Sequence, residues 1–160
     1  MKIRKATIKD LDQLTELYSQ YYDDLNKITP KRFQFFKKRR PSYKNEIKKS
    51  ILKDLKDRSK IIIVAEDKEL IATVSGLVKP ILSKEHFDKI KFGYLQYLFV
   101  EKTSRDQNIS KLLEVELIKW FKTRNCDYVR LEVASTNPAK RIYEKWGFES
   151  DSIKMIKKLK

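Results

Sequence analysis

Apolar and polar residues recur along this chain in the two periods that distinguish strands from helices. Alternation and β-branched runs predict strands, whereas apolar positions three and four residues apart predict helices. The predicted strands are residues 1–7, 61–65, 70–78, 92–100, 128–133, 148–149 and 153–159. The predicted helices are residues 10–22, 42–57, 109–122 and 138–146. The order β-α-α-β-β-β-α-β-α-β-β predicts an α/β fold, with helices packed on a mixed sheet, in one domain over residues 1–160.

Residues at the ends of these elements support the assignment. Asp10 and Ser42 are expected N-caps, because their side-chain oxygens can accept hydrogen bonds from the first helical turn. Gly147 stands where a C′ glycine ends a helix. Asp67 and Lys68 predict a tight turn, so the second and third strands should form a hairpin.

The C-terminal half contains two strand–turn–helix units. Strand 94–100 leads through the polar loop 105–110 into a helix, and strand 128–133 leads through Asn137 into another. A helix N-terminus aims backbone N–H groups at whatever lies above it, and such groups bind phosphates. The second unit carries Tyr143 in its last helical turns. We therefore expect a cleft for a phosphate-bearing cofactor, with one titratable hydroxyl at its edge.

The composition excludes several classes of site. One cysteine, Cys126, rules out an internal disulfide and a cysteine-based zinc cluster, and it is expected to be a buried small residue. One histidine, His86, rules out a histidine-rich metal site and is expected in a solvated loop, so no metal is predicted. No apolar run approaches the ~20 residues that cross a bilayer, and no secretory segment opens the chain. We expect a cytoplasmic protein without a membrane partner.

The formal net charge of +15 is densest in residues 27–60. A solvated, lysine-rich surface explains this charge most simply. An anionic substrate or partner is a second interpretation. Nucleic-acid binding is a third and less favoured one, because aromatic residues interleave with the charges: Phe33, Phe35, Phe36 and Tyr43.

The element order and the two C-terminal motifs resemble the GCN5-related N-acetyltransferase (GNAT) superfamily, over nearly the whole chain and most specifically over residues 94–148. The family's acetyl-CoA signature is a strand ending in Leu-x-Val, followed by Arg/Gln-x-x-Gly-x-Gly/Ala at a helix start. The resemblance implies a GNAT-like acyl-CoA N-acyltransferase fold with acetyl-CoA as co-substrate. It implies cofactor contacts at Leu98, Phe99, Val100, Arg105, Asp106, Gln107, Asn108, Ile109, Ser110 and Lys111.

The loop departs from the family pattern at both glycine positions, which are occupied by Asn108 and Ser110. Glycine there would allow unusual φ angles or a close approach to phosphate. Asparagine tolerates positive φ better than other residues with a Cβ, and serine is small. The loop is therefore expected to bind pyrophosphate, more weakly than a glycine loop.

The second motif matches the family's Ala-x-x-x-Tyr-x-x-x-Gly-Phe, here from Ala139 through Tyr143 to Gly147 and Phe148. The resemblance implies that the Tyr143 hydroxyl protonates the departing CoA thiolate as general acid. A phenol suits that role because it is protonated at neutral pH. The alternative is that Tyr143 is only a core aromatic residue.

A family asparagine that contacts the pantetheine arm usually lies seven residues before this tyrosine. Here Thr136 is the seventh residue and Asn137 the sixth, and either side chain can take the role. Asn137, which precedes a proline, is equally well explained as a helix cap.

The general base is expected at Glu132, in a segment that resembles bacterial ribosomal-protein alanine acetyltransferases. A carboxylate buried in an apolar strand would have a raised affinity for protons. The alternative is an exposed glutamate paired with a lysine or arginine. Tyr94 and Gln96 share a strand face and can order a water instead, and Glu101 is expected to be a surface charge.

The sequence thus predicts an acetyl-CoA-dependent N-acetyltransferase in which a primary amine attacks the thioester directly. The acceptor is a small-molecule or peptide amine, and the cluster Tyr18, Tyr21, Tyr22, Asp23 and Asp24 is a candidate to line its site. Two alternatives stay open: a catalytically weak acyl-CoA-binding regulatory module, and a basic nucleic-acid-binding protein. A homodimer is possible, since family members commonly form one.

Overall fold

A single mixed sheet organises the protein, for which a computed structural model describes residues 1–31, 40–79 and 90–157. Its strands in the described residues are β1 (Lys2–Lys5), β2 (Lys60–Asp67), β3 (Glu69–Lys79), β4 (Phe92–Val100) and β5 (Tyr128–Leu131), in the spatial order β1-β2-β3-β4-β5. The pairs from β1 to β4 are antiparallel, and β4 and β5 are parallel. The mixed α/β sheet predicted from the sequence is confirmed.

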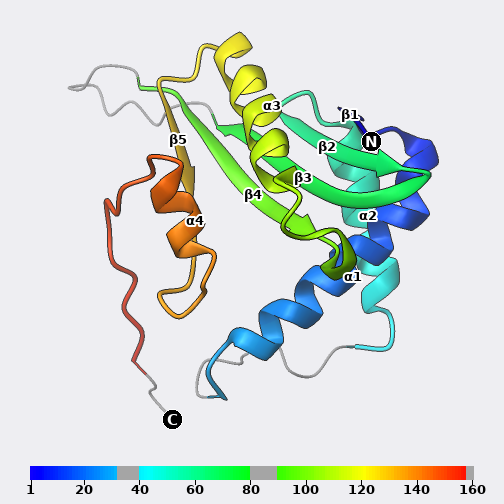
Figure 1. Ribbon diagram of the computed structural model, residues 1–160, viewed down its shortest axis with the longest axis horizontal. Coiled ribbons are helices and arrows are strands. Elements are labelled where there is room, and N and C mark those ends of the chain that lie inside the picture. Colours follow the sequence, from blue (N-terminus) through cyan, green and yellow to red (C-terminus); the bar gives the residue numbers. More distant parts are fainter. Residues whose placement is uncertain (32–39, 80–89, 158–160) are drawn as a thin grey trace.

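Helices cover both faces of this sheet (Figure 1). The helical elements are η1 (Ile8–Asp10), α1 (Leu11–Ile28), α2 (Tyr43–Lys56), η3 (Lys102–Ser104), α3 (Ile109–Thr123) and α4 (Lys140–Lys145). Helices α1 and α2 pack on one face and α3 on the other. Helix α1 runs six residues beyond its predicted end at residue 22. Its Thr29 N–H donates to the Leu25 carbonyl at 3.0 Å, which closes its last turn.

The apolar run of β2 is continuous because both of its faces are buried. Ile61 and Ile63 pack in one core with α3, whereas Ile62 and Val64 pack in the other with α1 and α2. The α3 face is close-packed: a Cβ built on Gly93 would lie 2.5 Å from Phe121 Cδ1. Glycine there lets the C-terminal end of α3, at Phe121, lie close to the sheet.

The prediction of two final strands is wrong for the described residues up to 157. The Phe148 N–H donates to the Tyr143 carbonyl at 3.0 Å, and the Gly147 N–H donates to Glu144 at 3.0 Å. With Gly147 at φ 87°, these bonds form the helix-terminating turn expected at that glycine. Phe148 therefore caps α4 instead of pairing in a sheet. Ile153 and Met155 are 88% and 92% exposed and form no ladder.

Some predictions fall outside the described residues. These are the C-terminal end of the last predicted strand and the positions of Phe33, Phe35, Phe36 and His86. In the part of the chain that the structure describes, no helix is long and apolar enough to cross a membrane.

A buried ion pair ties β1 to the start of α1. Asp10 occupies the predicted N-cap position, but its carboxylate turns back to accept hydrogen bonds from Arg4 at 2.8 Å and from the Thr7 N–H at 2.7 Å. Asp10 is 7% exposed. The hydrogen bond from Arg4 outweighs the cost of burial and lowers the pKa of Asp10 to about 2.

We expect Asp10→Asn to lower the free energy of unfolding by about 2 kcal/mol at neutral pH, because the charged pair is lost while the Thr7 bond can remain. Since the pKa of Asp10 is lowered in the folded protein, its contribution is complete above pH ~4 and disappears as the pH falls through 2. Urea unfolding at several pH values measures the difference between the two proteins. Asp12→Asn is the control, because Asp12 pairs with Lys48 at the surface. A difference between Asp10→Asn and the parent that is independent of pH would contradict this account.

Candidate functional site

The sheet opens between β4 and β5. Their parallel pairing joins residues Phe92–Leu95 to Tyr128–Leu131 and stops there. The β3–β4 register also shifts between Ser75 and Gly76, opposite Gln96, so β4 carries an extra residue at that point. A bulge of this kind bends a strand and increases its twist. Among the described strands, residues 97–100 pair only with β3, which leaves one edge of their backbone facing the opening (Figure 1).

The strand end places three predicted cofactor residues along this opening. Phe99 turns its side chain into the core beneath α1 and is 6% exposed. Leu98 and Val100 pack on the opposite face, against the core that contains α3. Because the side chains of residues 98–100 pack in the two cores, the backbone is the part of this strand that a ligand in the opening can contact.

The loop after β4 ends in a left-handed residue that starts α3. Asn108 has φ 58° and ψ 13°, and its carbonyl accepts hydrogen bonds from Lys111 at 3.1 Å and Leu112 at 3.2 Å. Asn108 is therefore the N-cap. The N–H groups of Ile109 and Ser110 fall in the first turn, where a helix supplies no acceptor for them. The expectation that Asn108 tolerates a positive φ is confirmed.

Arg105 links this loop to α1. Its Nε donates to the Val100 carbonyl at 3.1 Å, and a terminal nitrogen donates to Asp24 Oδ2 at 2.8 Å. Lys102 and Lys27 also lie 3.6 Å from Asp24. Burial opposes ionisation of Asp24, but the hydrogen bond from Arg105 and the nearby lysine charges lower its pKa overall. Three cations thus converge on one carboxylate beside the loop.

The remaining loop residues differ in their surroundings. Asp106, with φ 65°, and Gln107 are exposed at the tip of the loop. Ser110 is half-buried in the first turn of α3. The Lys111 side chain turns away along α3, towards Glu114 at 2.9 Å and the Trp146 ring at 5.4 Å.

Tyr143 lies on α4 between two aromatic rings. Its ring centroid is 5.7 Å from that of Trp146 and 6.1 Å from that of Phe148, both in edge-on contact. Burial, with a smaller contribution from Tyr21 of α1, raises the pKa of Tyr143 to about 12. The phenol therefore stays protonated throughout the neutral range, as a proton donor requires.

The turn before α4 places Thr136 at the surface and Asn137 in a structural role. Asn137 Oδ1 accepts a hydrogen bond from the Ala139 N–H at 2.9 Å, which closes an Asx turn just before α4. The N-cap of α4 itself is Ala139. The amide NH₂ group of Asn137 is not part of the bond that closes the turn.

Glu132 is exposed, so the expectation that its carboxylate is buried in an apolar strand is not met. It follows the end of β5, is 76% exposed and forms an ion pair with Lys154. This arrangement is the alternative that the sequence left open, and it arises because β5 ends at Leu131.

Gln96 is also exposed, on the bulged part of β4. Cys126 is half-buried, and burial raises the pKa of its thiol, which disfavours a nucleophilic thiolate.

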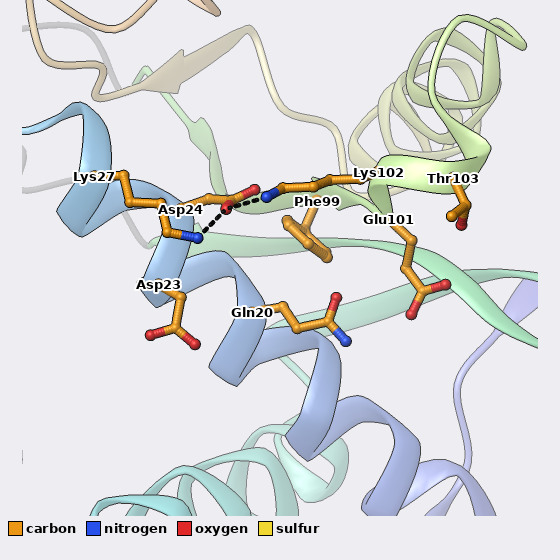
Figure 2. A pocket seen from close by; sticks show the side chains of 8 residues that line it. All are labelled: Gln20, Asp23, Asp24, Lys27, Phe99, Glu101, Lys102 and Thr103. Carbon is orange, nitrogen blue, oxygen red and sulfur yellow. Dashed lines mark ion pairs between the residues drawn. The ribbon is translucent and has the colours of Figure 1, made fainter.

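A cavity of about 350 Å³ lies between α1 and the end of β4 (Figure 2). Its lining residues are Gln20, Asp23, Asp24, Lys27, Phe99, Glu101, Lys102 and Thr103. Figure 2 shows the ion pairs of Asp24 with Lys27 and Lys102 next to Phe99, with Gln20 and Asp23 along α1 and Glu101 at the end of β4. Gln20, Lys27, Lys102 and Thr103 were not among the predicted site residues, and Glu101 was expected at the surface. Their convergence is invisible in the sequence, since about 80 residues separate the two sides.

An aromatic cluster borders α1 on the same face of the sheet. The Tyr97 ring lies 4.8 Å from Tyr18 and 5.4 Å from Tyr21, and its hydroxyl is 3.0 Å from that of Tyr22. The three tyrosines of the predicted acceptor cluster are therefore packed around one strand residue. Asp23, by contrast, lines the cavity.

Comparison with known proteins places the chain in a family. Residues 11–148 match the model of the Acetyltransferase (GNAT) family, so the chain belongs to that family. No curated protein matches it significantly. The described residues hold no group of three or more histidine, cysteine or carboxylate side chains suited to a metal ion.

Several solved structures are similar in fold. The BH1408 protein from Bacillus halodurans aligns with a TM-score of 0.86 at 22% identity, over 99% of this chain and 100% of that one. A predicted acetyltransferase from Clostridium acetobutylicum, solved with acetyl-CoA, aligns with a TM-score of 0.76 at 21% identity, over 98% and 95%. The aminoglycoside N-acetyltransferase AAC(6')-Iy, solved with CoA, aligns with a TM-score of 0.77 at 14% identity, over 99% and 94%. The expected GNAT-like fold is confirmed.

We expect Asn108→Ala to lower the free energy of unfolding by about 1 kcal/mol, because alanine adopts the left-handed conformation at φ 58° less readily than asparagine does. Asn108→Gly should match the parent or exceed it. Urea unfolding measures both variants, and Ser110→Ala within the helical turn is the control. Equal stability of the alanine variant and the parent would show that the left-handed conformation is not required.

Proposed function

We propose that this protein is an acetyl-CoA-dependent N-acetyltransferase that acetylates a primary amine by direct attack. The observation that carries the proposal is the opening beside β4. There the strand edge that has no partner on the β5 side is followed, after η3 and the loop, by the left-handed cap at Asn108 and the first turn of α3. A strand edge suits an amide-bearing pantetheine arm, and a helix N-terminus suits a diphosphate.

The chemistry of these groups fits CoA. The edge formed by the backbone of Leu98 and Val100, with Phe99 between them, offers hydrogen-bonding groups to the pantetheine arm, although the Val100 carbonyl also accepts a bond from Arg105. The first-turn N–H groups at Ile109 and Ser110 face the start of the helix, with Arg105 and Lys102 nearby as cations. Arg105 has five N–H donors and uses two in the contacts with Val100 and Asp24, so others remain for phosphate oxygens.

The thioester supplies an acyl carbon that is reactive towards amines. The amine nitrogen forms the new C–N bond, the C–S bond breaks, and the thiolate takes a proton from the Tyr143 hydroxyl. The edge-on rings of Trp146 and Phe148 support this role because they restrict the phenol to one orientation. A backbone N–H of residues 98–100 polarises the carbonyl.

An amine must lose a proton before or during attack. Glu132 is exposed and its carboxylate is paired with Lys154, so its assignment as general base is the weaker option. A water ordered by Tyr94 and Gln96 is the better option, because Gln96 is exposed where β4 and β5 separate.

The acceptor amine enters from the α1 side. The cavity there presents the carboxylates of Asp23 and Glu101 beside the ring of Phe99, a combination that attracts a cationic amine. The left-handed Asn108 adopts the backbone conformation that a loop glycine would allow, which supports CoA binding by this loop.

A thermal-shift measurement with acetyl-CoA, CoA and a panel of small and peptide amines tests this proposal. Because a ligand that binds only the folded protein raises the melting midpoint, acetyl-CoA should raise it. At least one amine should then release free CoA thiol. Absence of a shift at millimolar acetyl-CoA would contradict the proposal.

We expect Tyr143→Phe to lower kcat about 100-fold with little change in the Kd of acetyl-CoA, because only the proton donor is removed. Release of CoA thiol measures kcat, and calorimetry measures Kd. Asn108→Gly, in the same assay, should bind acetyl-CoA more tightly and keep kcat. Full activity of Tyr143→Phe would remove Tyr143 from the chemistry.

A further inference from the structure

One lysine connects the two cofactor motifs of this chain. Lys111 follows the loop on α3, and its Nζ lies 2.9 Å from Glu114 Oε2 and 5.4 Å from the centroid of the Trp146 ring. Trp146 is the C-cap of α4, and its ring is 5.7 Å from that of Tyr143. A continuous set of contacts therefore runs from the buried face of α3 to the proposed proton donor.

Glu114 is the unusual member of this set. Only 6% of it is exposed, on a helix face otherwise formed by Ile109, Leu113 and Leu117. A buried carboxylate is costly unless a cation compensates it, and Lys111 supplies that cation. A second pair with the same spacing on α3, Glu116 with Lys119, is exposed on both sides. The two pairs differ in burial, and only the buried one reaches another helix.

Helix α4 needs such an external contact. It has six residues, and none of them is buried. A helix this short has little stability of its own and takes its orientation from the groups that touch it. Lys111 holds the indole face of Trp146, and the edge of Trp146 meets the Tyr143 ring at an interplanar angle of 72°.

We propose that Glu114 and Lys111 are positioning residues, which hold Trp146 and through it set the orientation of the Tyr143 hydroxyl at the acyl-transfer site. Because Lys111 directly follows the loop proposed for the diphosphate, the contact also couples that loop to α4. The inference rests on the proposed role of Tyr143.

Tryptophan fluorescence tests the contact directly. The chain has two tryptophans, so Trp120→Phe leaves Trp146 as the only tryptophan, and excitation selective for tryptophan then reports this residue. In that background, Glu114→Gln keeps the shape of the side chain but removes its charge and frees Lys111. The Trp146 emission maximum should move to longer wavelength as the ring becomes more exposed. Glu116→Gln is the matched control and should leave the emission unchanged.

Steady-state kinetics tests the consequence. Glu114→Gln should lower kcat about fivefold and change the KM of acetyl-CoA less than about twofold, because a displaced proton donor affects the transition state more than binding. Lys111→Met should lower kcat in the same way, whereas Lys111→Arg should retain it, since arginine keeps the charge and also stacks on indole. If Glu114→Gln fails to fold, the two Lys111 variants decide the question.

Unchanged emission and unchanged kcat in Glu114→Gln would overturn the inference. Equal effects in Glu114→Gln and Glu116→Gln, or equal loss in Lys111→Arg and Lys111→Met, would overturn it too. Failure of the proposed function is recognised separately: full activity of Tyr143→Phe removes the proton donor, whereas the Trp146 emission reports the contact whether or not the protein is active.

Discussion

The separation of β4 from β5 is the constraint on which the rest of the site depends. The parallel pair ends at Leu95 and Leu131, at the point where an extra residue in β4 shifts its register with β3. Backbone groups beyond that point keep partners on the β3 side only, among the described strands. An exposed strand edge inside a sheet is costly unless something pairs with it. The family to which the chain belongs transfers acyl groups, and such an edge is where an extended ligand arm can complete the ladder.

Packing on both sheet faces keeps that opening in place. Helix α3 lies close to the sheet over Gly76 and Gly93, and α1 and α2 fill the opposite face. The first turn of α3 is consequently held at the end of β4, while Asp24 of α1 reaches Arg105 in the intervening loop. The loop after β4 and α1 thus share one ion-pair network. Helix α4 has no buried residue and depends on the contacts of Trp146, Tyr143 and Phe148.

Local patterns predicted the elements well and predicted their partners poorly. The strand β2 and the helix-terminating turn at Gly147 depend only on residues close by in the sequence, so both were predicted correctly. The exposure of Glu132 had no local signal, because it depends on where β5 ends and on the pairing with Lys154. The prediction of the final strands was wrong for a related reason. Alternation predicted them, but the Phe148 N–H bonds to the Tyr143 carbonyl at the end of α4. The convergence of Gln20 and Glu101 on one cavity had no local signal.

The sequence by itself determined the order of elements as far as α4, the family resemblance and the positions of the loop residues, because propensity, periodicity and motif spacing are properties of short segments. Only the tertiary structure decided which of those residues meet. Three features depend on elements that are far apart in the chain. They are the separation of β4 from β5, the hydrogen bond from Arg105 to Asp24, and the contact of Lys111 with Trp146. Such contacts arise from packing in three dimensions, where side chains compete for a limited number of partners.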